Sequence, residues 1–214
     1  MNKAIADLRK EYSSETLLEQ DVVASPIEQF KKWWDQAIAS AILEPNAMTL
    51  ATASPDGLPS ARIVLLKGFD EKGFVFYTNY ESYKAMQLEE NPKASLVFHW
   101  KELERQVRIM GVVEKVAATA SDEYYHSRPV GSRIGAWASP QSKVIPHREW
   151  LEEEFEKRKS ELSNNEIPRP PFWGGYIVKP VIIEFWQGRF SRLHDRIQYT
   201  LEEGGTWKIE RLAP

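Results

Sequence analysis

Hydrophobic residues recur with a helical period near the start of the chain and with a strand period over most of the remainder. Residues 1–25 are polar, and we interpret them as an N-terminal arm that can be mobile. From Pro26 onward the apolar residues follow the spacing of an amphipathic helix: Ile27, Phe30, Trp34, Ile38 and Ala41. Ser25 can cap this helix, and Pro45 is expected to end it.

From residue 47 the hydrophobic period changes to two, which is typical of strands. The pattern predicts eight of them, over residues 47–54, 60–69, 74–79, 93–100, 104–116, 176–187, 192–200 and 206–212. Turn residues such as Gly204 and Gly205 separate neighbouring strands as hairpins. A chain of hairpins predicts an antiparallel sheet, and six or more strands favour a closed or half-open barrel that hides the sheet edges.

Helical segments interrupt the strands and complete a mainly β fold with added helices. We predict them over residues 81–91, 121–128, 132–139 and 146–162, the last with charge pairs at i,i+4 spacing. The length of 214 residues suits one domain, which we place at residues 26–214.

Composition narrows the possible functions. The net charge is −3 and the isoelectric point is about 5.9, which favours neither nucleic acid nor a membrane surface as partner. No apolar run approaches the ~20 residues of a membrane span, and the first residues do not resemble a secretory signal. With no cysteine and no HExxH pattern among four histidines, we expect a cytoplasmic protein without a metal site.

The segment RLHDR, residues 192–196, carries the most distinctive chemistry. If it forms a strand, Arg192, His194 and Arg196 lie on one face. These cationic groups would repel one another unless an anion or carboxylates lay among them, and the Arg fork matches phosphate oxygens. A solvated edge strand is the simpler interpretation of such a triplet alone. The preceding Phe185-Trp186 pair and the flexible Gly188 favour one wall of a site for a phosphate-bearing ligand.

Several motifs occur together in a fixed order from Arg9 to Pro214. They are RKEY (9–12), RIVLLKGFDEKGFVFYTN (62–79), ERQVRIMG (104–111), YYHSRP (124–129), GAW (135–137), QS (141–142), PFWGG (171–175), EFWQG (184–188), RLHDR (192–196) and RLAP (211–214). In this combination the chain resembles the pyridoxine (pyridoxamine) 5'-phosphate oxidase family. The resemblance implies a split β-barrel of Greek-key type, which forms a homodimer and binds FMN in clefts between the two subunits.

The resemblance also implies a reaction. Pyridoxamine 5'-phosphate or pyridoxine 5'-phosphate is oxidised at C4' by hydride transfer to flavin N5, and O2 accepts the electrons to give H2O2 and pyridoxal 5'-phosphate, a step of vitamin B6 biosynthesis and salvage. The alternative is a non-catalytic flavin- or pyridoxal-phosphate-binding protein on the same barrel, because a fold does not determine chemistry. Retention of a complete substrate set favours the enzyme. A barrel that binds single-stranded nucleic acid is disfavoured by the acidic isoelectric point.

The family's FMN contacts map onto this chain residue by residue. They are Arg62, Ile63, Val64, Leu65, Leu66, Lys67, Tyr77, Thr78, Tyr83, Lys84, Gln106, Gln141, Ser142, Trp186 and Arg196. Lys84 lies near the start of a predicted helix, where free N–H groups also favour anions. The family usually has Arg immediately before this Lys, and here the residue is Tyr83. A neutral side chain therefore replaces one charged contact to the FMN phosphate.

The family's substrate contacts map in the same way. They are Arg9, Lys10, Glu11, Tyr12, Lys67, Tyr124, Arg128, Ser132, Arg192 and His194. The guanidinium of Arg128 and the hydroxyls of Ser132 and Tyr124 suit the 5'-phosphate. Arg192 and His194 are the candidate catalytic residues, with His194 either a general base or an orienting group. The stretch 9–12 is either a lid over bound substrate or a solvated tail.

Overall fold

The computed structural model describes residues 15–162 and 167–214. The predicted substrate residues Arg9, Lys10, Glu11 and Tyr12 lie outside the described residues. The chain separates into two compact units. The first comprises residues up to Leu50 together with Ser95–Gly111 and Pro180–Pro214, and the second comprises Ala51–Ala94 and Val112–Lys179. The prediction of one domain over residues 26–214 stays a prediction.

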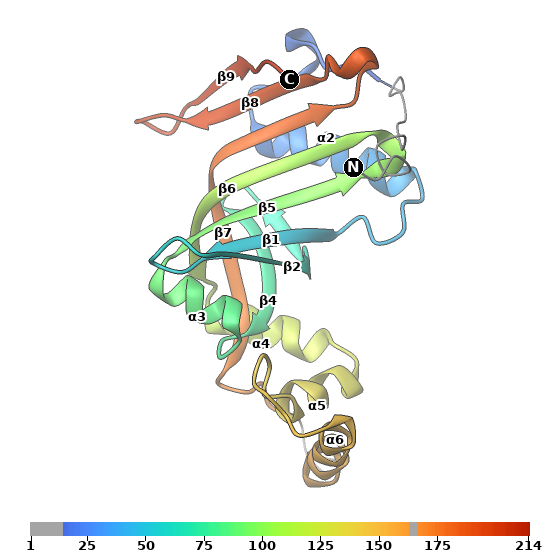
Figure 1. Ribbon diagram of the computed structural model, residues 1–214, viewed down its shortest axis with the longest axis vertical. Coiled ribbons are helices and arrows are strands. Elements are labelled where there is room, and N and C mark those ends of the chain that lie inside the picture. Colours follow the sequence, from blue (N-terminus) through green and yellow to red (C-terminus); the bar gives the residue numbers. More distant parts are fainter. Residues whose placement is uncertain (1–14, 163–166) are drawn as a thin grey trace, which may run out of the picture. The chain divides into compact units, whose positions relative to one another are not determined.

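The described residues form nine strands in one sheet (Figure 1). The order is β2-β1-β5-β6-β7-β4-β3, and β8 and β9 continue from β7. The strands are β1 (Ala47–Ala53), β2 (Pro59–Leu65), β3 (Gly68–Asp70), β4 (Gly73–Asn79), β5 (Lys93–Trp100), β6 (Arg105–Lys115), β7 (Trp173–Gln187), β8 (Asp195–Leu201) and β9 (Trp207–Arg211). The predicted strand over residues 60–69 is divided into β2 and β3.

The strands pair antiparallel, as the hairpin pattern of the sequence predicts. Strand β4 pairs antiparallel with the first part of β7, and β8 pairs antiparallel with its second part. Strands β2 and β4 of the second unit contact each other although four strands separate them in the sheet order. The sheet therefore curls on itself, and the prediction of a mainly β, antiparallel split barrel with added helices is confirmed.

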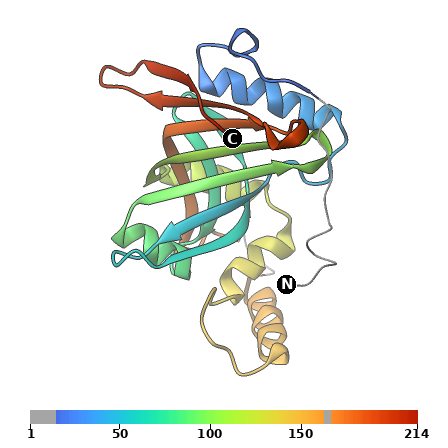
Figure 2. The same ribbon diagram turned by 45° about the horizontal axis from the view of Figure 1, so that its top comes forward.

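Helix α2 (Pro26–Ala39) covers the core of the first unit, alongside the C-terminal strands (Figure 2). Its N-terminus is as predicted: the Ser25 hydroxyl accepts a hydrogen bond from the backbone N–H of Glu28 at 3.3 Å. The predicted C-terminus at Pro45 is wrong, because Ala41 adopts a left-handed φ of 53° and the chain leaves the helix earlier.

The buried stripe of α2 also differs from the predicted one. Trp33 and Ala37 are buried, whereas the predicted Ile38 is 53% exposed. The Trp33 ring packs edge-on against Phe185, with 5.2 Å between centroids. Because a helical turn takes 3.6 residues, successive buried positions can be three or four residues apart. The sheet surface under the helix determines which spacing is used.

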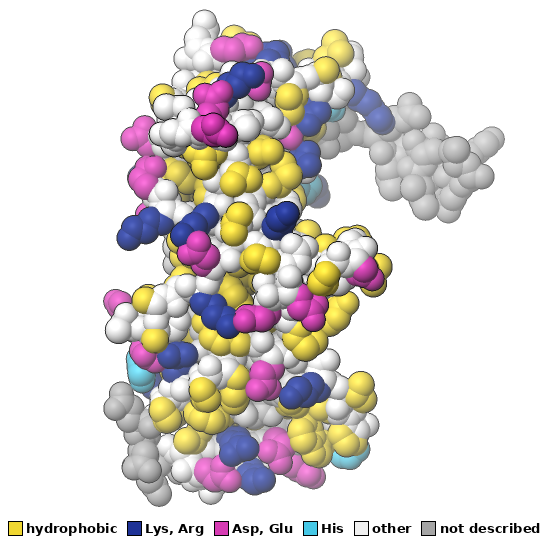
Figure 3. All heavy atoms as spheres, turned by 90° about the vertical axis from the view of Figure 1, so that its left-hand side faces the viewer, with side chains coloured by type: hydrophobic (Ala, Val, Ile, Leu, Met, Phe, Trp, Pro, Cys, Tyr) yellow, Lys and Arg dark blue, Asp and Glu magenta, His cyan; other side chains and the backbone are white. Residues whose placement is uncertain are grey.

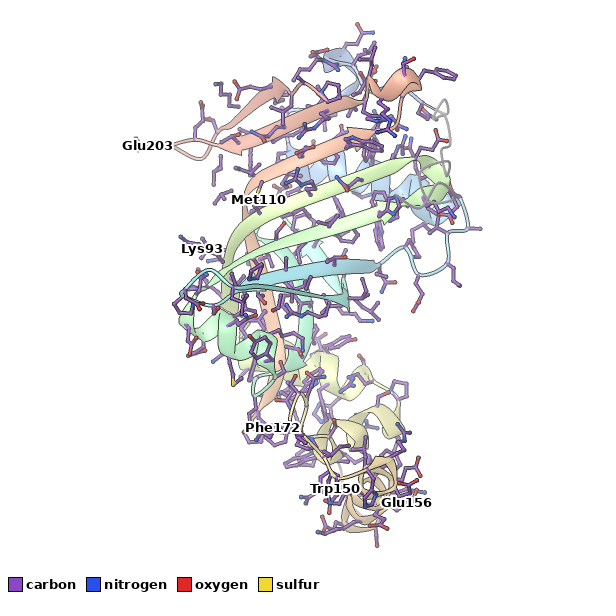
Figure 4. The ribbon with its side chains drawn as sticks, in the orientation of Figure 1. Lys93, Met110, Trp150, Glu156, Phe172 and Glu203 are labelled. Carbon is purple, nitrogen blue, oxygen red and sulfur yellow. The ribbon has the colours of Figure 1, made fainter. Side chains whose placement is uncertain are left out.

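The second unit contains four helices among the described residues, and each predicted segment overlaps one of them. They are α3 (Tyr83–Glu90), α4 (Ala118–Ser127), α5 (Val130–Ala138) and α6 (Arg148–Leu162). Tyr125, Ile134, Ile167 and Trp173 form a hydrophobic cluster beneath α4 and α5. Helix α6 packs against α5 and carries Trp150 and Glu156 (Figure 4). Of the described helices, none has the length and apolar character that a membrane crossing requires.

The described residues also include three short 3-10 turns. They are η1 (Glu19–Asp21), η2 (Lys101–Leu103) and η3 (Phe190–Arg192). On the face that Figure 3 presents, the described acidic and basic side chains are interspersed and do not gather by sign. This distribution agrees with the small net charge of the chain.

Candidate active site

A cavity of about 520 Å³ lies within the second unit and brings together most of the site residues predicted there. Its wall includes eleven of them: Ile63, Val64, Leu65, Lys67, Tyr77, Thr78, Lys84, Tyr124, Arg128, Ser132 and Gln141. Three consecutive residues of β2 line the cavity. Because successive strand side chains point to opposite faces, this strand contributes its edge. The backbone is thus brought close to whatever occupies the cavity.

A cationic corner of the cavity is formed by Lys84. Its ammonium donates hydrogen bonds to Thr78 Oγ1 at 3.2 Å, Ser82 Oγ at 3.1 Å and Gln141 Oε1 at 3.1 Å. All three acceptors are neutral oxygens. Burial, helped by the nearby charge of Arg62, lowers the pKa of Lys84 to about 8. A cation that is desolvated and held by neutral groups fits an anionic ligand group such as a phosphate.

Arg62 lies behind this corner and is anchored by hydroxyl groups. Its guanidinium donates to Thr52 Oγ1 at 2.7 Å and to Ser60 Oγ at 2.5 Å. Both hydroxyls donate in turn to Gln87 Oε1 at 2.6 Å. Burial lowers the pKa of Arg62. Arg62 does not line the cavity, so its part there is electrostatic support. Leu66, predicted beside it, is a core residue with 5% exposure.

Stacked aromatic rings form one wall. The ring centroid of Tyr77 lies 4.0 Å from that of Tyr124, with an interplanar angle of 20°, and 5.6 Å from that of Trp173, with an interplanar angle of 11°. Trp173 lines the cavity and was not among the predicted contacts, although the PFWGG motif signals its position. A Cβ at the following Gly174 would lie 2.2 Å from Tyr80 Oη, so a larger residue here would force the Tyr80 side chain to move.

Neighbouring packing holds the aromatic wall in place. The ring of Phe172, labelled in Figure 4, meets the ring of Trp137 edge-on at 5.8 Å. Trp137 Nε1 donates a hydrogen bond to the Pro168 carbonyl at 2.8 Å. The Lys67 ammonium lies 5.8 Å from the Tyr124 ring centroid. The wall is thus a rigid aromatic surface with a cation at its edge, which suits a flat heteroaromatic ring.

Arg128 is the cavity residue best suited to bind an anionic ligand group. Its guanidinium lies 4.6 Å from the Trp173 ring centroid, and burial lowers its pKa. Its Nη1 atom is buried and has no hydrogen-bond partner among the described residues. Such a donor is costly unless a ligand satisfies it. Ser132, four residues later on α5, lines the same cavity and adds a hydroxyl.

Three predicted flavin contacts, Gln106, Trp186 and Arg196, lie in the first unit. In the register of β7 with β8, Trp186 is opposite Arg196. The guanidinium of Arg196 forms a two-point contact with Glu184, at 2.8 Å from Nε to Oε1 and 3.1 Å from Nη2 to Oε2. Gln106 is half-buried on β6. Glu184 was missed from sequence, because an acidic residue is not expected among contacts to an anionic cofactor.

The predicted strand face of Arg192, His194 and Arg196 is wrong. Residues 190–192 form η3, and β8 begins only at Asp195. Ser191 and Arg192 have positive φ values of 54° and 61°, so the alternation of a strand does not apply to them. Arg192 is exposed and precedes the strand that carries Arg196.

His194 is held in this loop by two contacts. Its ring lies 4.5 Å from that of Trp186, and its Nδ1 accepts a hydrogen bond from the backbone N–H of Arg189 at 3.1 Å. Burial, followed by the charge of Arg192, lowers the pKa of His194. Both effects favour the neutral imidazole.

Two predicted residues lie at the margin of the cavity. Tyr83, at the start of α3, is 45% exposed and does not line the cavity. Ser142 follows the lining residue Gln141, is exposed, and has a φ of 72°. Their contacts with a cofactor stay predictions.

Comparison with known proteins identifies the family. Residues 34–160 match the family model described as pyridoxamine 5'-phosphate oxidase. The chain belongs to this family. Residues 173–214 match a second model, described as the pyridoxine 5'-phosphate oxidase C-terminal dimerisation region.

Curated relatives of this family match over nearly the whole chain. A pyridoxine/pyridoxamine 5'-phosphate oxidase of Nostoc punctiforme is 61% identical over 214 residues, which cover 100% of both chains. A protein of the same name from Cupriavidus pinatubonensis is 58% identical and covers 98% of this chain and 99% of its own.

Solved structures of other proteins share the fold of this chain. PhzG from Burkholderia lata, in complex with tetrahydrophenazine-1-carboxylic acid, has a TM-score of 0.88 at 31% identity and covers 94% of this chain and 100% of its own. A pyridoxamine 5'-phosphate oxidase-related, FMN-binding protein from Nostoc punctiforme has a TM-score of 0.71 at 19% identity, covering 89% and 98%. The second likeness concerns the fold alone.

Proposed function

We propose that this protein is an FMN-dependent oxidase that converts pyridoxamine 5'-phosphate and pyridoxine 5'-phosphate to pyridoxal 5'-phosphate. The observation that carries the proposal is the buried Nη1 of Arg128, which has no hydrogen-bond partner in residues 15–162 and 167–214. Arg128 lines a cavity that also has a stacked aromatic wall. A phosphate beside Arg128 and a flat ring along the wall account for both features. Relatives with 55–61% identity carry the name of this enzyme and support the assignment.

In this proposal the 5'-phosphate is bound by Arg128, Ser132 and Tyr124. The guanidinium supplies charge-assisted donors, and the hydroxyls complete the shell. Lys67, at the edge of the aromatic wall, orients the substrate ring. Arg192 and His194 act at the reacting carbon, and residues 9–12 are proposed to contribute further substrate contacts.

The corner of the cavity at Lys84 fits the phosphate end of FMN, because the Lys84 ammonium donates to neutral oxygens in the contacts described above. Ile63, Val64 and Leu65 on the edge of β2, together with Lys67 and Tyr77, are proposed to line the flavin, and Arg62 is proposed to support the site from behind. Gln106, Trp186 and Arg196 are proposed to complete the flavin contacts in a homodimer, which the C-terminal dimerisation region supports. Bound FMN supplies the redox chemistry, as acceptor at N5 of the hydride from substrate C4' and as donor of the electrons that reduce O2 to H2O2.

His194 is proposed to orient the substrate rather than to remove a proton. Its Nδ1 already accepts the Arg189 N–H, so protonation at that atom would break the contact that fixes the ring. Its lowered pKa keeps the imidazole neutral near pH 7.

The test is an absorbance spectrum of the purified protein with FMN, repeated without oxygen after addition of pyridoxamine 5'-phosphate. We expect flavin bands that bleach with substrate and return on admission of air, together with formation of H2O2. Unphosphorylated pyridoxamine is the matched control and should bleach the bands far more slowly. Flavin bands that persist with pyridoxamine 5'-phosphate would instead support the non-catalytic binding protein.

A further inference from the structure

A buried carboxylate lies among the proposed flavin contacts of the first unit. Glu184, on β7, is only 2% exposed. Carboxylates are rarely buried to this extent unless they are paired, since desolvation of the charge is costly. The partners of Glu184 therefore indicate why an acid is placed there.

Glu184 joins guanidiniums from two other strands. Arg196 of β8 contacts both carboxylate oxygens, at 2.8 and 3.1 Å, and Arg108 of β6 donates to Oε2 at 3.1 Å. Arg196 also donates from Nη1 to the Ala213 carbonyl at 2.7 Å. Three of the five N–H donors of Arg196 are thus committed, and the plane of its guanidinium is fixed.

The strand register places this network beside the proposed cofactor residues. Trp186 is opposite Arg196, and Glu184 is opposite Gln198, so all four side chains share one face. On β6, Arg108 follows Gln106 by two residues and therefore shares its face. The alternate residues, including Ile183, Phe185 and Ile197, are fully buried on the other side. Glu184 therefore shares a face with the proposed flavin contacts Gln106, Trp186 and Arg196, and its carboxylate accepts hydrogen bonds from the guanidiniums of Arg108 and Arg196.

We propose that Glu184 is a positioning residue of the flavin site, which acts by holding Arg196, and with it Arg108, in a fixed orientation. This inference rests on the proposed function, because Arg196 is itself a proposed FMN contact. Without the carboxylate, two guanidiniums would face each other unneutralised and would swing apart, so that the remaining donors of Arg196 would no longer point in one direction.

The test is FMN affinity measured by fluorescence titration of the apoprotein, for the full-length dimer. We expect Glu184→Gln to raise the Kd for FMN about tenfold or more, the effect of losing charge-assisted hydrogen bonds. Arg196→Gln should raise it by a similar factor. The double variant should be little weaker than either single variant, because both changes remove the same contact.

Glu210→Gln is the matched control. It removes the same charge from an exposed residue of β9 that pairs with Lys208 at 2.7 Å, and it should leave FMN affinity unchanged. Loss of a buried carboxylate can also destabilise the protein. Glu184→Asp therefore serves as a second variant, because it keeps the charge but shortens the reach; we expect an intermediate Kd.

The outcomes separate the two proposals. A wild-type protein that binds no FMN contradicts the proposed function itself. Wild-type binding with an unchanged Kd in folded Glu184→Gln overturns the positioning role alone. If Glu184→Gln does not fold, a wild-type Kd in Glu184→Asp overturns it equally. If the losses of FMN binding free energy in the two single variants add fully in the double variant, Glu184 does not act through Arg196.

Discussion

The cations beside the cavity of the second unit are held differently from those of the C-terminal strands in the first unit. In the second unit, Lys84 is held by neutral oxygens, and Nη1 of Arg128 is buried without a partner among the described residues. In the first unit, Arg196 is paired with Glu184, and Arg211 contacts Glu19 at 2.7 Å and Asp195 at 2.9 Å. Cations that lack acidic partners indicate where a ligand anion belongs, whereas cations that have them build the scaffold of a site.

This comparison is most directly tested at Arg128. Arg128→Ala should lower kcat/KM for pyridoxamine 5'-phosphate about 100-fold, because a buried charge-assisted contact to phosphate is lost. FMN should remain bound. Steady-state kinetics with the phosphorylated and unphosphorylated substrates measure the effect, and the preference for the phosphate should largely disappear. Arg148→Ala, which removes an exposed Arg of α6 paired with Glu152, is the control and should behave as wild type. Retained phosphate preference in Arg128→Ala would remove Arg128 from the substrate site.

Arg192→Ala should lower turnover about tenfold or more and leave FMN bound, because Arg192 is assigned to substrate orientation. Single-turnover bleaching of the flavin without oxygen measures the step directly. Loss of the yellow colour on purification of this variant would contradict the assignment and place Arg192 in the cofactor site instead.

The Lys84 corner predicts a pH dependence of FMN binding. Burial lowers the pKa of Lys84 to about 8, so the ammonium that attracts a phosphate is present below this pH and is lost above it. The affinity of the apoprotein for FMN should therefore fall as pH rises from 7 to 9, by up to about tenfold per unit above the pKa. Lys84→Met should bind FMN weakly at pH 7, without this decline. An equally steep decline in Lys84→Met would assign it to another group.

The smallest expected effect concerns Tyr83. Tyr83→Arg adds a cation at an exposed position beside Lys84 and should lower the Kd for FMN about two- to fivefold, in the range of exposed ion pairs. Titration at low and high salt checks this, since the gain should shrink as salt screens the charge. An unchanged Kd at low salt would show that residue 83 does not face the cofactor phosphate.

Much of the fold follows from local patterns. The capped start of α2 at Pro26 and the strand 74–79 agree with their predicted positions, because helix caps and strand alternation are properties of short segments. The predictions that were wrong depend on contacts distant in sequence. The buried stripe of α2 is selected by the sheet that it covers. Residues 190–194 form a 3-10 turn and a short loop rather than the start of a strand, because the chain must reverse after β7 before β8 can pair with it.

Periodicity and motif order were sufficient for the class of fold and the family, since these depend on spacing along the chain. Only the tertiary structure decided the pairing of Glu184 with Arg108 and Arg196 and the stacking of Trp173 on Tyr77. The same holds for the burial of Arg128 Nη1 without a partner in the part of the chain that the structure describes. The physical reason is that charge neutralisation and desolvation depend on which side chains meet in space. Residues 76 positions apart in the chain, such as Arg108 and Glu184, have no local signal that pairs them.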